Sequence, residues 1–122
     1  MATIAYPGNL QTAQTGNADS TNTISRLSMG EPNLRQMVLR IVSTVGATPT
    51  VTVNIKGSVD GTTFFNVPYS PMSAAAGEYT TAALVITTAV TSLYALATGQ
   101  SWNYLKLVMT LNTNVTLTSD LL

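Results

Sequence analysis

The side chains that most often carry catalysis are absent or scarce in this chain. It contains no histidine and no cysteine, which excludes the Ser-His-Asp and Cys-His arrangements of nucleophilic catalysis. Zinc would therefore lack its usual nitrogen and sulfur ligands. A Ser-Lys pair would have to use Lys56 or Lys106, and strand alternation places both outside the core. We therefore expect no catalytic lysine.

The acidic residues stand singly in polar stretches. Glycoside hydrolysis needs two carboxyl groups on either side of one bond, and calcium needs several oxygen ligands in one place. The spacing offers neither arrangement, and the chain has no glycine-rich phosphate loop. The sequence thus predicts no catalytic, cofactor-binding or metal-binding residues, and we expect the protein not to be an enzyme. The five carboxylates are Asp19, Glu31, Asp60, Glu78 and Asp120.

Two patterns bear on carbohydrate. Trp102, with Tyr94 and Tyr104 near it in sequence, could stack on a sugar ring, or it could close one end of a hydrophobic core, which we favour. Asn114-Val115-Thr116 matches the acceptor sequence for N-glycosylation. The first ten residues lack the basic region and apolar core of a secretory signal, so we give this match little weight.

Composition points to an unusual surface. Charged residues make up 8% of the 122 residues and the formal net charge is zero, whereas about 25% is ordinary for soluble domains. Threonine is the main polar residue, with 21 copies beside 10 serines and 9 asparagines. Such a surface is either a solvated β-sheet surface or one covered by partners. No basic cluster suits nucleic acid, and no apolar run is long enough for a membrane-spanning helix.

The stretch from Val51 to Tyr69 predicts a β-hairpin. Apolar and polar residues alternate strictly along its first strand, and Asp60-Gly61 supplies a turn in which Gly61 takes a positive φ. We expect one set of residues to face the core and the intervening set to face away. The core set is Val51, Val53 and Ile55, and the other is Thr52, Asn54 and Lys56.

Further strands are predicted on both sides of the hairpin. Leu34 to Gly46 is apolar on both faces, as in a central or covered strand, and Gly46 to Pro49 connects it to the hairpin. Alternation also marks Val90 to Thr98, Trp102 to Asn112 and a last strand after a turn at 112–114. Glu78 to Ala89 fits a helix by its alanines and a strand by its β-branched residues, and we interpret it as a strand. Residues 34–122 thus predict one all-β, β-sandwich or jelly-roll-like domain.

The first 33 residues lack this regularity. They are rich in Thr, Asn, Gln, Gly and Pro, and their apolar residues keep neither a strand nor a helix period. We predict an extended N-terminal arm, residues 1–33, that lies across a neighbouring chain, although it could instead wrap its own domain. Its expected partner contacts are Ile4, Tyr6, Leu10, Ile24 and Leu27.

The hairpin resembles one found in galactose-binding-like jelly rolls, including discoidin-type modules. The likeness rests on Ser58-Val59-Asp60-Gly61-Thr62-Thr63-Phe64 and on the later Tyr104-Leu105-Lys106-Leu107. It implies a sandwich fold, and a carbohydrate- or receptor-binding module on a phage particle is the function that we keep as an alternative.

The whole chain is similar to the small capsid decoration, or cement, proteins of tailed bacteriophages. The likeness lies in the polar arm, the threonine-rich strands, the hairpin and the absence of Cys and His. It implies a structural virion protein, made in the host cytoplasm and located on the capsid surface, that reinforces the lattice. The implied partners are copies of itself, as a homotrimer, and a major capsid protein.

Overall fold

A computed structural model describes residues 2–25, 37–72, 79–97 and 102–122, and in these ranges the chain is all-β without a helix. The strands form one mixed, nine-stranded sheet whose only parallel pair among those described is β1 with β3. In chain order they are β1 (Ala2–Ala5), β2 (Gly8–Gln14), β3 (Asn22–Ser25), β4 (Met37–Ser58), β5 (Phe64–Asn66), β6 (Tyr69–Pro71), β7 (Leu84–Ile86), β8 (Thr91–Leu96) and β9 (Tyr104–Leu121).

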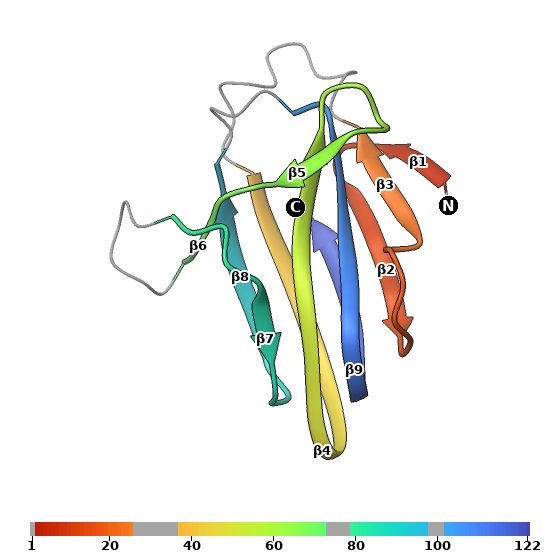
Figure 1. The fold of residues 1–122 in the computed structure, drawn as a ribbon, viewed down its shortest axis with the longest axis vertical. Helices are drawn as coiled ribbons and strands as arrows, with labels where there is room; N and C mark the ends of the chain where they lie inside the picture. Colours follow the sequence, from red (N-terminus) through yellow and green to blue (C-terminus); the bar gives the residue numbers. More distant parts are fainter. Residues whose placement is uncertain (1, 26–36, 73–78, 98–101) are drawn as a thin grey trace.

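Two long strands, β4 and β9, organise the sheet. They pair antiparallel from Leu39 opposite Leu121 to Ser58 opposite Tyr104, with register shifts between Val45 and Thr52. At these shifts the two-stranded ribbon folds back on itself, as the β4 ribbon does at its lower end in Figure 1. Each strand therefore contributes to both layers of a sandwich, and we call this fold the ribbon bend (residues 45–50 and 111–114).

The other strands extend the two halves of the ribbon. Layer 1 combines residues 37–45 and 115–121 with β2 on one side and with β8 and β6 on the other. Layer 2 combines residues 51–58 and 104–110 with β3 and β1 on one side and with β5 and β7 on the other. The result is a β-sandwich-like domain, as the strand pattern predicts.

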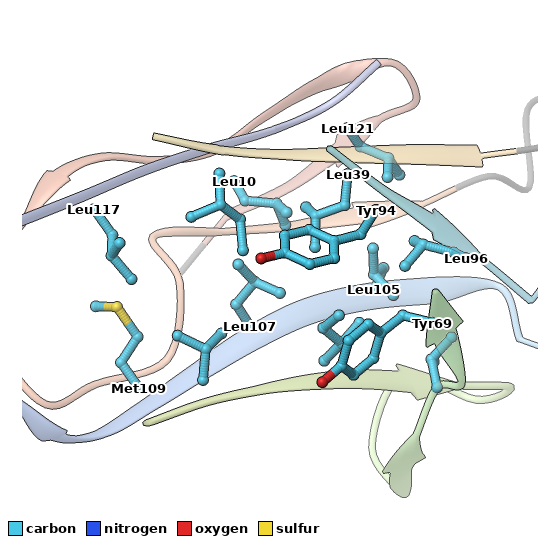
Figure 2. Close-up of a cluster of buried hydrophobic side chains, with 14 of the residues drawn as sticks. Leu10, Leu39, Tyr69, Tyr94, Leu96, Leu105, Leu107, Met109, Leu117 and Leu121 are labelled. Carbon is cyan, nitrogen blue, oxygen red and sulfur yellow. The ribbon is translucent and has the colours of Figure 1, made fainter. Parts of the chain in front are cut away.

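The core fills the space between the layers. Residues at alternate positions of β4 and β9 are buried, and the intervening positions are mostly half-buried. Figure 2 shows side chains from both layers meeting, with Leu39 and Tyr94 near Leu105 and Leu107. Since each strand alternates, one row of every strand faces the core and the other row forms an outer face of the sandwich.

The predicted hairpin is present. Residues 56–58 of β4 pair antiparallel with β5, and Gly61 in the connection has a φ of 85°. The expected core set of Val51, Val53 and Ile55 is buried, while the alternate set is half-buried. The alternation and the Asp-Gly turn were thus sufficient to predict this part of the fold.

The N-terminal segment differs from the expected arm. Residues 2–25 hold three strands that join the same sheet, with β2 and β3 each paired to β9. Leu10 and Ile24 are fully buried in the chain's own core, which corrects their expected role as contacts on a neighbouring chain. The pairing of β2 with β9 contains register shifts, so buried and exposed residues do not alternate regularly along β2. The sequence pattern therefore does not reveal this strand.

Three segments also differ from expectation. Residues 46–49 and 112–114 were expected to separate strands, but β4 and β9 continue through them as the ribbon bend. The alternation of Trp102 to Asn112 places Leu111 on the same face as the buried Leu107 and Met109, but Leu111 is 73% exposed at this bend. Within Glu78 to Ala89 the strand is confined to β7, and Glu78 lies outside the described residues.

Candidate interaction surfaces

Two of the three aromatic side chains that were considered for sugar stacking, Trp102 and Tyr94, lie inside the domain, and Tyr104 is half-buried. Trp102 is 1% exposed, and its indole N–H donates to the Ala97 carbonyl at 3.1 Å. Tyr94 is buried in edge-to-face contact with Tyr69, with ring centroids 5.7 Å apart. Burial, with a smaller contribution from Tyr94, raises the pKa of the Tyr69 hydroxyl. These buried rings stabilise the core and offer no open face to a sugar.

The Asp60 carboxylate is occupied within its turn. One oxygen accepts hydrogen bonds from the backbone N–H groups of Thr62 and Thr63, both at 2.8 Å, and from the Ser58 hydroxyl at 2.9 Å. The Ser58 oxygen in turn accepts the Gly61 N–H. The bonds from Thr63, Thr62 and Ser58, in that order, hold the pKa of Asp60 well below its usual range. A carboxylate held this way stabilises a turn and is poorly suited to proton transfer.

On layer 2, a cation stands between an aromatic ring and a carboxylate. The Lys106 ammonium lies 4.2 Å from the centroid of Phe64 and 2.7 Å from an Asp19 carboxylate oxygen. The pair joins the β2–β3 connection to β9, beside the isolated bridge of Asp19 with Val108. Since the ammonium has both an anion and a ring as partners, its role here is structural.

On layer 1, a polar row crosses four strands. The row consists of successive partners in register that share the outer face. Three of them are polar, namely Arg40 on β4, Asp120 on β9 and Asn9 on β2, and the fourth is Leu93 on β8. Arg40 donates through one terminal nitrogen to Asp120 at 2.9 Å, and the Asn9 amide donates to the other Asp120 oxygen at 2.8 Å. The buried Nε of Arg40 has no hydrogen-bond partner in the described part of the chain.

This row also sets the protonation of its carboxylate. Burial by itself would raise the pKa of Asp120, but the hydrogen bonds from Asn9 and Arg40 and the charge of Arg40 outweigh it and lower the pKa. Asp120 is therefore charged at neutral pH, and the row presents one positive and one negative group side by side.

The described surface carries few unpaired charges and several exposed apolar side chains. Among the charged side chains in the described ranges, four form the two ion pairs, Asp60 serves its turn, and Lys56 has neither role. Nine large hydrophobic side chains are exposed instead. They are Val45, Val59, Met72, Tyr79, Val85, Val90, Leu93, Leu111 and Leu122.

Surface hollows accompany some of these side chains. One of about 560 Å³ lies between the layer edges and is lined by Met72, Leu84 and Leu93, among others. Another, of about 490 Å³, lies beside the polar row at Arg40, Asp120 and Leu122. Both are open, and neither holds a group of catalytic side chains.

The expected partner-contact residues separate into three groups. Leu10 and Ile24 are core residues, as described above, while Ile4 and Tyr6 are half-buried and pack against the core. The Tyr6 hydroxyl donates to the Leu122 carbonyl. Leu27 lies outside the described residues. The outer apolar residues of layer 1 were missed as contact candidates, although Val38 and Val42 already made Leu34 to Gly46 apolar on both faces.

The described residues contain neither a cluster of metal ligands nor a membrane-spanning helix. No group of three or more acidic residues that could hold a metal ion occurs in them, and they contain no helix long and apolar enough to cross a membrane. Comparison with known proteins adds no relative, because no family model, no curated protein and no solved structure matches the chain.

Proposed function

We propose that the protein is a structural component of a tailed-phage particle, which binds and reinforces the capsid lattice as a homo-oligomer. It would bind copies of itself and a major capsid protein, and it would act on the outer surface of the capsid. This proposal rests on the similarity to capsid decoration proteins and on one surface property of the structure.

The observation that carries the proposal is that the described surface has few unpaired charges and many exposed apolar side chains. Of the charged side chains in the described ranges, Lys56 is the one with neither an ion pair nor a role in a turn, whereas nine large apolar side chains are exposed. A protein with zero formal net charge and such a surface tends to associate. Contacts with other subunits in a protein shell would cover this surface permanently. The surface therefore favours a structural role over that of a free monomer.

The carbohydrate-binding alternative loses its main candidate in this structure. Trp102 and Tyr94 are buried, so neither offers the exposed ring face that stacking on a sugar requires. The discoidin-like hairpin is a fold signal, because Asp60 and Gly61 form the turn and no ligand contact is needed to explain them.

Deletion of the gene from the source phage tests the proposal. Particles without the protein should release their DNA at a lower temperature than wild-type particles, as followed by the fluorescence of a DNA-binding dye during heating. Adding the purified protein should restore the release temperature and should cosediment with the particles. Particles that are unaffected by the deletion, together with a purified protein that does not bind them, would overturn the proposal.

A further inference from the structure

We propose that the outer face of layer 1 binds a second copy of this chain around a two-fold axis, with Arg40 of each copy facing Asp120 of the other. We call this surface the Arg40 face. It consists of the outward row of β8, β4 and β9, together with the C-terminal residue. The residues on which the argument depends are Val38, Arg40, Val42, Leu93, Asp120 and Leu122.

The apolar character of the face is the first argument. Residues 37–42 of β4 alternate between Met37, Leu39 and Ile41 in the core and Val38 and Val42 on the outer face. Strands that are apolar on both faces are typical of sheets that are covered on both sides. Here the outer side remains accessible, because Leu93 is 40% and Leu122 is 45% exposed.

Charge identifies a second copy as the partner. The face carries one cationic and one anionic side chain on adjacent strands, 2.9 Å apart, so its side-chain charges cancel. When two such faces meet around a two-fold axis, each Arg40 can approach the Asp120 of the other copy, and no like charges are forced together. A two-fold interface uses the same patch twice, so a self-complementary patch of this kind suits it.

Unused hydrogen-bonding capacity supports the same arrangement. Arg40 reaches Asp120 through one terminal nitrogen, and its side chain is 42% exposed, so it remains accessible to a partner. A guanidinium favours two parallel bonds to a carboxylate. The partner copy's Asp120 would supply a second carboxylate to the exposed part of the Arg40 side chain.

This inference deepens the proposed function, since it names the surface through which copies associate, as two-fold pairs in place of the homotrimer that the resemblance implies, but the two fail separately. A monomer that still binds capsids would overturn the interface alone. A dimer that does not bind capsids would overturn the capsid role alone.

The first experiment measures mass and association by sedimentation of the full chain over a range of concentrations. The wild-type protein should reach twice the 12.8 kDa of one chain. Leu93→Gln should weaken the dimer by about tenfold or more, because it places an amide in an apolar contact. Val85→Gln is the matched control, since Val85 is a 58% exposed aliphatic residue of layer 2, on β7. It should leave the dimer unchanged.

The second experiment uses charge reversal in separate copies. Arg40→Glu and Asp120→Arg each place like charges across the interface, so each variant alone should dimerise weakly. An equimolar mixture should form heterodimers again, because opposite charges then face each other at both symmetry-related positions. In every copy of the mixture the intramolecular pair remains broken, so restored association cannot come from repair of the individual fold.

Several results would overturn the interface. These are a wild-type protein that stays monomeric at the highest concentration reached, a wild-type trimer, equal weakening by the Leu93 and Val85 variants, or a mixture that associates no better than its two components. Circular dichroism of each variant confirms that a loss of association is not a loss of folding.

Discussion

The two ends of the β4 segment 51–58 turn the chain by similar means but at different conformational cost. At the hairpin end (residues 57–63), side chains of Ser58 and Asp60 bond the backbone, and the one positive φ falls on a glycine. At the ribbon bend, Asn112 accepts the Val115 N–H and donates to its carbonyl, but positive φ values fall on Thr48, Leu111 and Asn114. Leucine and threonine are disfavoured there.

The hairpin end is also more tightly packed than the ribbon bend. A Cβ on Gly57 at the hairpin end would lie 2.6 Å from Val67 and 3.1 Å from Trp102, so the chains there are in close contact. The ribbon bend instead exposes Val45 and Leu111 to solvent. Burial therefore stabilises the hairpin end, whereas the bend keeps backbone strain because the paired strands on either side fix its course.

The largest effect is expected from Trp102→Ala. The side chain is buried against the hairpin end, so its removal should cost about 3–5 kcal/mol of unfolding free energy. Urea denaturation measures this directly. Leu111→Ala at the bend is the control and should change stability by less than about 0.5 kcal/mol, as exposed substitutions do. Equal losses would show that the two ends do not differ in packing.

Gly61→Val should give the next largest loss. At a φ of 85° a β-branched side chain is strained, at a cost of about 1–3 kcal/mol. Gly16→Val is the matched control, since it lies in open space and has no positive φ. The two midpoints of urea unfolding should differ clearly, and coincidence of the two would contradict the role of the Gly61 conformation.

These differences also explain what could be predicted from the sequence. The hairpin is encoded by residues adjacent in the sequence, namely the alternating strand and the Asp60-Gly61 turn. Local signals of this kind can be recognised in the sequence alone. The burial of Leu10 and Ile24 depends on the pairing of β2 and β3 with β9, whose partner residues lie about 110 and about 80 positions later in the chain. No local pattern records pairing over such distances.

The ribbon bend shows a second limit. Gly46, Pro49 and Asn112 correctly indicate a change of direction, but they do not say whether the strands pair across it. The sequence predicts that β4 is apolar on both faces. It does not predict the ion pair on the outer face, because Arg40 meets Asp120 only through strand pairing.

At the bend, Leu111→Gly should have the opposite sign. Relief of the left-handed conformation is worth about 1–2 kcal/mol, against about 0.5–1 kcal/mol for the added freedom of glycine in the unfolded chain. The net result should be a gain of about 0.5–1 kcal/mol in urea denaturation. Leu107→Gly, a fully buried position on the same strand, should be strongly destabilising. A loss at both positions would mean that the bend stores no strain.

The smallest effect is a pH dependence at the hairpin end. Because the Asp60 pKa is lower in the folded chain than in the unfolded chain, its charged form contributes stability above the unfolded value of about 4. This contribution is lost as the pH falls below that value toward the folded pKa, since the unfolded chain then binds a proton that the folded chain does not. Asp60→Asn keeps an oxygen acceptor but does not titrate, so the stability difference from wild type should be largest at neutral pH and shrink below about pH 4. Urea midpoints of both proteins at pH 7 and in steps from pH 5 to pH 2 test this, and a difference that stays constant over that range would show that the turn gains nothing from the charge of Asp60.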